Sequence, residues 1–174
     1  MTSTSAVETT RTGWTQGPND APVTIIEYVN YQCPDVRGAE PLLAKLREEA
    51  GDRLRFEVRH LPLAKHARAM PAAEAAEAAG AQGAFWAMHG RLLTPPLALE
   101  DDDLLGYAEE LGLDTEQFAA DLESHRHAAA IAADLVSAAQ ANATTTPTLI
   151  VNGVSFRDSE VDQALARARE LLAQ

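Results

Sequence analysis

Apolar positions follow two different periods along the chain, and each period indicates a different kind of element. The run VTIIEYV, residues 23–29, is almost continuously apolar, which is typical of a strand buried on both faces of a sheet. The segment RLRFEVRH, residues 53–60, alternates apolar and polar positions, which predicts a strand with one wetter face. The run TLIV, residues 148–151, is followed by Asn152-Gly153 and VSF, which together predict a hairpin.

Helical spacing of the apolar positions fills the rest of the chain. A helix is predicted over residues 34–50, because Pro34 suits the first helical turn and Gly51 suits the stop. Residues 65–142 are rich in Ala and contain no strand pattern, so we expect several helices there. The segment SEVDQALARARELLA, residues 159–173, predicts a final amphipathic helix.

The resulting order, β-α-β, a helical block and β-β-α, predicts an α/β protein with a four-stranded mixed sheet. The first unit requires a right-handed crossover between parallel strands, whereas the terminal hairpin is antiparallel. Turn-forming residues in QGPNDAP suggest that residues 1–16 are a flexible N-terminal arm. We expect residues 17–64 and 143–174 to form the sheet domain, with residues 65–142 as an inserted helical subdomain.

Composition narrows the classes of function. The chain has 26 acidic and 14 basic residues, a formal charge of −12, which argues against binding nucleic acid phosphates or an anionic membrane surface. The N-terminal segment MTSTSAVETT lacks the basic and apolar regions of a signal peptide, and no apolar run approaches the ~20 residues that span a bilayer. One cysteine excludes an internal disulfide, so we predict a cytoplasmic protein.

Cys33 lies where the first strand gives way to the first helix, in the stretch VNYQCPDVRGAEP. Backbone N–H groups at a helix N-terminus can lower a cysteine pKa from ~8.5 toward ~3.5–7.5, which favours the nucleophilic thiolate. Asp35 in the first helical turn acts against a thiolate, although an acid there also suits the helix for structural reasons. The alternative for Cys33 is a small buried apolar residue.

The histidines do not have the spacing of a metal site, so we expect no bound metal. We interpret the first two of them as structural or rim residues. The five histidines are His60, His66, His89, His125 and His127.

Four segments together resemble the DsbA-type thiol–disulfide oxidoreductases, in their bacterial soluble branch. They are DAPVTIIEY, YQCPDV, RHLPL followed by HARAMPAAEAAEAAGAQGAFWAMHGRLL, and TTTPTLIVNG. The resemblance runs from about Gly17 to the C-terminus and implies a thioredoxin-like fold with a helical insertion. In this family a Cys-Pro-X-Cys motif begins the first helix, but the position of its second cysteine holds Val36. The chain therefore resembles a monothiol variant.

The resemblance also implies roles for individual residues. Cys33 would be the catalytic thiol within the motif that continues through Pro34, Asp35 and Val36. Glu27 would be a buried acid beneath the active site that assists proton movement, unless its strand lies near a solvated edge.

Substrate contacts would come from the loop before the last pair of strands. Pro147 would be the cis-proline that faces the thiol, and Thr146 would offer its backbone to substrate as an added strand. The alternative for this loop is a polar connection with no binding role.

These roles predict thiol–disulfide exchange through Cys33, with an external thiol such as glutathione releasing the mixed disulfide. We expect no tightly bound cofactor, and a disulfide-containing peptide, a protein or a low-molecular-weight thiol as the partner. Apolar surface around the site would allow a homodimer. The alternatives are a redox-inactive module that binds peptides or proteins, and a glutathione-dependent transferase or isomerase.

Overall fold

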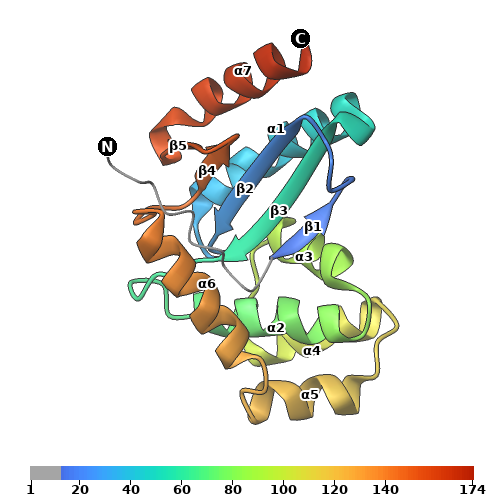
Figure 1. Cartoon of the computed structure of the whole chain (residues 1–174). Coiled ribbons are helices and arrows are strands. Elements are labelled where there is room, and N and C mark those ends of the chain that lie inside the picture. Colours follow the sequence, from blue (N-terminus) through green and yellow to red (C-terminus); the bar gives the residue numbers. More distant parts are fainter. Residues whose placement is uncertain (1–12) are drawn as a thin grey trace.

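A computed structural model describes residues 13–174 and contains a five-stranded mixed sheet (Figure 1). The strand order across the sheet is β1-β3-β2-β4-β5. β2 and β3 are parallel, and every other neighbouring pair is antiparallel. The strands are β1 (Trp14–Gln16), β2 (Val23–Val29), β3 (Leu54–His60), β4 (Thr148–Val151) and β5 (Val154–Phe156).

The predicted α/β class and order of elements are confirmed, but the prediction of four strands was wrong. Trp14–Gln16 forms a fifth strand that pairs with β3, so these residues are not part of a loose arm. Residues 1–12 of the predicted arm lie outside the described residues. A three-residue strand has almost no periodic pattern, and this one is held by the Trp14 ring, which stacks on Phe85 at 4.7 Å between centroids.

Helices cover both faces of the sheet and one end of it (Figure 1). α1 and α7 pack on one face, and α6 packs against β3 on the other. α2, α4 and α5 lie beyond one end of the sheet, and α3 lies next to β1, where Phe85 stacks on Trp14. The helices are α1 (Pro34–Ala50), α2 (Ala69–Ala81), α3 (Phe85–Leu93), α4 (Asp101–Glu110), α5 (Thr115–Glu123), α6 (Ala128–Gln140) and α7 (Val161–Leu172), with 3₁₀ turns at Gly51–Arg53 and Asp158–Glu160.

The two faces of β2 belong to two different apolar cores, because successive side chains of a strand point to opposite sides. Val23, Ile25 and Val29 join the large core beneath α1. Tyr28 joins a smaller core under α6, where its hydroxyl lies 2.6 Å from that of Ser137. β2 is therefore buried on both sides, as its continuous apolar run predicts. No helix within residues 13–174 is long and apolar enough to cross a membrane.

Candidate active site around Cys33

Cys33 lies directly before the first residue of α1, with extended backbone angles of φ −78° and ψ 124°. Its backbone N–H donates to the carbonyl of Asn30 at 2.9 Å, which closes the turn between β2 and the helix. Cys33 is only 6% exposed, and its Sγ donates a hydrogen bond to the carbonyl oxygen of Thr146 at 3.3 Å. The structure thus brings Cys33 against the loop before β4, where the Thr146–Pro147 peptide bond is cis.

The rest of the predicted motif divides between surface and core. Pro34 and Asp35 are exposed, whereas the Val36 side chain is fully buried under the helix start. Val36 is an apolar core residue at the position where the family resemblance led us to expect a second thiol. With one cysteine in the whole chain, a mixed disulfide formed at Cys33 cannot be broken from within the molecule.

Two threonine hydroxyls in the facing loop are buried without a hydrogen-bond partner among residues 13–174. They are the Oγ1 atoms of Thr145 and Thr146. The next hydroxyl, that of Thr148, donates to the carbonyl of Thr145 at 2.7 Å and so holds the loop as it enters β4. Buried hydroxyls without partners are costly, so a ligand that supplied one would gain binding energy here.

The opposite side of the Cys33 turn is held by the segment after β3. The Asn30 side-chain amide lies 2.6 Å from Nδ1 of His66, and the side-chain oxygen of Gln32 accepts from the backbone N–H of Arg68 at 2.7 Å. His66 is therefore a rim residue that positions the loop, which agrees with its interpretation from sequence.

Glu27 lies in the central strand β2, opposite Val58 of β3 and Leu149 of β4. Its side chain is fully buried, so the alternative of a solvated edge position is wrong. Neither carboxylate oxygen has a hydrogen-bond partner within the described part of the chain. Burial raises the pKa of Glu27 well above 4.5, the Glu40 carboxylate raises it further, and Arg47 lowers it.

A second acid, the partly buried Glu40 of α1, connects this region to the helical insertion. His89 of α3 lies 3.6 Å from Glu40 through Nε2 and 3.0 Å from the Tyr31 hydroxyl through Nδ1. Burial lowers the pKa of His89, which favours the neutral ring. Burial alone would raise the pKa of Glu40, but contacts with His89 and Arg47 outweigh it and lower that pKa.

Sequence reasoning missed this cluster. Glu40 and His89 are separated by three elements along the chain, and each by itself suits an ordinary helix surface. The one available signal was Glu40 among the apolar positions of the first helix, where it falls one residue after buried Ala39.

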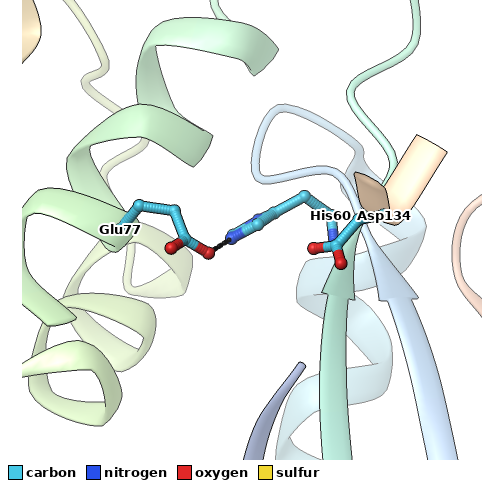
Figure 2. Close-up of side chains that lie close together, drawn as sticks. All are labelled: His60, Glu77 and Asp134. Atoms are coloured by element: carbon cyan, nitrogen blue, oxygen red, sulfur yellow. Dashed lines mark hydrogen bonds and ion pairs between the residues drawn. The ribbon is translucent and has the colours of Figure 1, made fainter. Parts of the chain in front are cut away.

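His60 is buried in a third polar cluster, which Figure 2 shows between β3, α2 and α6. Its Nε2 lies 2.9 Å from Oε1 of Glu77, and its backbone N–H donates to Asp134 at 2.9 Å. Glu77 also accepts from the Trp14 indole at 2.9 Å. These contacts make His60 a structural residue that ties the end of β3 to two helices of the insertion.

The same three side chains also carry nitrogen and oxygen atoms that can coordinate a divalent metal ion. One ligand atom from each of His60, Glu77 and Asp134 lies within 4.8 Å of the others. No spacing in the sequence could reveal this set, because its members come from three separate elements. The absence of a metal stays a prediction, and the hydrogen bonds of His60 with Glu77 and Asp134 already account for the arrangement of the cluster.

Comparison with known proteins places this geometry in a family. The chain matches the family described as Thioredoxin over residues 9–168. A thioredoxin-like oxidoreductase from Silicibacter pomeroyi superposes with a TM-score of 0.75 at 30% identity, over 90% of this chain and 91% of that one. BdbD from Bacillus subtilis superposes with a TM-score of 0.79 at 21% identity, over 92% of each chain, and so shows the shared fold.

Other relatives of this chain are named as Na(+)/H(+) antiporters and not as oxidoreductases. A protein named Na(+)/H(+) antiporter NhaA 1, from Salinispora arenicola, is 45% identical over 154 residues, which are 88% of this chain and 24% of that protein. A protein named Na(+)/H(+) antiporter NhaA, from Herminiimonas arsenicoxydans, is 44% identical over 144 residues, or 83% of this chain and 23% of that protein. The chain spans about a quarter of the length of these relatives.

The family match covers the whole sheet and the insertion, and the structural neighbours share the arrangement of both. The order of strands and helices thus agrees with the expected thioredoxin-like fold, with one sulfur at the start of α1. The chain therefore belongs to the thioredoxin family, as a single-cysteine member with the fold of the DsbA-type thiol–disulfide oxidoreductases.

Proposed function

We propose that this protein catalyses thiol–disulfide exchange through Cys33 alone, with an external thiol as the second reactant. The observation that carries the proposal is the position of Sγ, at the N-terminus of α1 and 3.3 Å from the Thr146 carbonyl. In this position the sulfur faces the backbone against which an extended substrate would lie as an added strand.

Exchange takes place in two steps. The Cys33 thiolate attacks one sulfur of a bound disulfide, a new S–S bond forms to Cys33, and the other sulfur leaves as a thiolate. The single cysteine then requires an external thiolate, for which glutathione is a candidate, to attack the mixed disulfide and regenerate Cys33. The external thiolate attacks the substrate sulfur of the mixed disulfide, so Cys33 leaves as a thiolate. Over the whole cycle the external thiol is oxidised and the sulfur that left in the first step is reduced, so no bound cofactor is needed.

Glu27 is our candidate for the group that stores the proton beneath the site. Its fully buried carboxyl favours the protonated form, because burial raises its pKa. We place the reaction in the cytoplasm, because a single cysteine suits a reducing compartment.

The deciding experiment is the rate of Cys33 alkylation in the folded protein from about pH 4 to about pH 10. A midpoint clearly below ~8.5, together with turnover of a small disulfide that Cys33→Ser abolishes, supports the proposal. Absence of labelling until the protein unfolds contradicts it, because a thiol that does not react in the folded state cannot catalyse exchange.

A second candidate is a binding module without redox activity. Val36 favours it, because the buried side chain removes the internal resolving thiol. The antiporter names of the curated relatives also favour a domain that works as part of a larger protein. If this candidate holds, Cys33→Ser leaves binding to a peptide partner unchanged, whereas a Thr146→Pro substitution, which removes a backbone N–H next to Pro147, weakens it.

A further inference from the structure

One residue, Asn30, closes the turn that carries Cys33. Its backbone carbonyl accepts from the backbone N–H of Cys33 at 2.9 Å, and its side-chain oxygen accepts from the backbone N–H of Gln32 at 3.0 Å. Asn30 is only 1% exposed, so both hydrogen bonds lie in the interior. The conformation of Asn30 therefore fixes where the chain enters α1 with its reactive sulfur.

The hydrogen bonds of the Asn30 side chain define the protonation state of His66. A backbone N–H only donates, so the Asn30 atom that faces Gln32 is the oxygen, and the amide nitrogen lies 2.6 Å from Nδ1 of His66. The amide nitrogen also only donates, so Nδ1 must be the unprotonated atom of the ring that accepts. His66 is therefore neutral when the turn is closed, with its proton on Nε2.

Protonation of His66 is incompatible with this arrangement. The imidazolium ring has a proton on each nitrogen, so Nδ1–H would point at the NH2 group of Asn30, and two donors would face each other. Rotating the amide by half a turn would give His66 an acceptor but would place the NH2 group against the Gln32 N–H. In either case a buried polar group of the turn loses its partner, which is costly.

Charged groups on the surrounding elements do not replace His66 in this role. Within residues 13–174, none of them contacts the His66 ring through a hydrogen bond or an ion pair. Histidine is also the side chain that ordinarily changes charge between about pH 5 and about pH 8, whereas carboxylates, Lys and Arg ordinarily keep theirs. The surrounding groups are Lys65 and Arg68 of the same segment, Asp35 of α1, Glu100 and Asp101 at the start of α4, and Asp134 of α6.

We propose that neutral His66 is a positioning residue for Cys33, and that protonation of His66 loosens the Cys33 turn and slows exchange. This inference rests on the proposed exchange reaction and adds a control by pH to the same site. A second hydrogen bond, from the backbone N–H of Arg68 to the side-chain oxygen of Gln32 at 2.7 Å, does not titrate and keeps the turn attached. The change is therefore local, and it disturbs the alignment of Sγ with the Thr146 carbonyl.

The first test needs no enzymatic activity. Nitrogen NMR of the imidazole rings reports which ring nitrogen carries the proton, and loss of a signal in His66→Asn assigns it to His66. We expect the proton on Nε2 at about pH 8, and we expect the Gln32 amide to exchange faster with solvent as His66 becomes protonated. A proton on Nδ1 of the neutral ring, or a Gln32 amide that does not respond to the titration of His66, overturns the inference.

The second test follows mixed-disulfide formation at Cys33 by mass spectrometry from about pH 5 to about pH 8. The substrate is the disulfide dimer of acetyl-Ala-Cys-Ala-amide, which is uncharged and long enough to pair with the Thr146 backbone. Each rate is divided by the fraction of Cys33 thiolate, measured by ultraviolet absorbance against Cys33→Ser, because only the thiolate attacks. The rate per thiolate should fall about tenfold in acid, in step with protonation of His66, as expected for the loss of one buried hydrogen bond.

Substitutions separate the accepting atom from the titrating ring. His66→Leu removes the acceptor and should be about tenfold slower per thiolate at every pH. His66→Asn places an oxygen where Nδ1 was, so it should recover the rate that His66→Leu loses and show no fall in acid. His125→Asn is the matched control at an exposed histidine of the insertion, where the φ of 50° suits asparagine, and it should keep the full pH profile.

The outcomes distinguish this inference from the proposed function. Circular dichroism and the melting temperature check that each variant folds, and His66→Asn carries the test alone if His66→Leu does not. A fall in acid that persists in His66→Asn assigns the pH dependence to another group and overturns the inference. If the peptide disulfide fails to react with an alkylatable Cys33 at every pH, the proposed exchange reaction fails, while the NMR test still decides whether His66 controls the turn.

Discussion

Glu27→Gln should stabilise the protein, by an amount that grows as the pH rises. Glu27 is fully buried in β2, its carboxylate oxygens have no partner within residues 13–174, and burial raises its pKa well above 4.5. Gln has nearly the same shape and does not ionise. The substitution therefore removes only the cost of holding a carboxyl group in an environment that rejects its charge.

The sign of this effect on stability follows from the number of protons that Glu27 binds in the folded and in the unfolded chain. Below about pH 4.5 Glu27 is protonated in both the folded and the unfolded chain, so the substitution changes little. Above this value the unfolded chain loses the proton and the folded chain keeps it, so the free energy of unfolding falls by about 1.4 kcal/mol per pH unit. The fall ends at the raised pKa of the folded state, beyond which both states are ionised.

The assay is urea unfolding of the protein and of Glu27→Gln, from about pH 4 to about pH 8, followed by circular dichroism and tryptophan fluorescence. The difference in free energy between the two proteins should be near zero at the acidic end and then grow by about 1.4 kcal/mol per pH unit. In the difference between the two free energies of unfolding, the contributions of groups that titrate equally in both proteins cancel.

Glu40→Gln is the matched control, because the same chemical change is made at an acid with the opposite shift. Contacts with His89 and Arg47 lower the pKa of Glu40 despite its burial, so its carboxylate contributes stability above the unfolded pKa that is lost in acid. Glu40→Gln should therefore destabilise the protein more at neutral than at acidic pH. Parallel pH curves for the protein and Glu27→Gln would refute the reasoning, since they would mean that Glu27 is solvated in the folded state.

Two further substitutions test the site and the fold. Val36→Cys supplies a second thiol at the start of α1, so a mixed disulfide at Cys33 should be released without added thiol. The product is an internal disulfide, which mass spectrometry detects. Because the new side chain is smaller than the buried valine, the free energy of unfolding should fall by on the order of 1 kcal/mol. Gly80→Ala should lower the free energy of unfolding by about 1–3 kcal/mol in urea titrations, because the added Cβ overlaps the Trp14 indole. Gly106→Ala in α4 meets no atom within 4 Å and should instead gain about 0.5–1 kcal/mol, so equal effects at the two glycines would contradict the packing argument.

Elements with a strong local pattern were predictable from sequence. The continuous apolar run of β2, the alternating positions of β3 and the Asn152-Gly153 turn each depend on residues close together in the chain. The same holds for the start of α1, where Pro34 follows a cysteine that must lie at the helix N-terminus. Local backbone preference and the side-chain period determine these features, and neither requires knowledge of the rest of the fold.

What the sequence by itself determined is thus the order of the elements, the single thiol at a helix start and the acidic charge of the chain. Only the tertiary structure decided that β1 pairs with β3, that Glu27 lies in the centre of the sheet, and that His89 reaches Glu40. It also placed Asp35 beside Asp158 and Asp162, from opposite ends of the chain, around one hollow. The physical reason is that burial and the pairing of charges depend on which distant segments pack together. Contacts between distant segments leave no periodic pattern in the sequence from which they could be predicted.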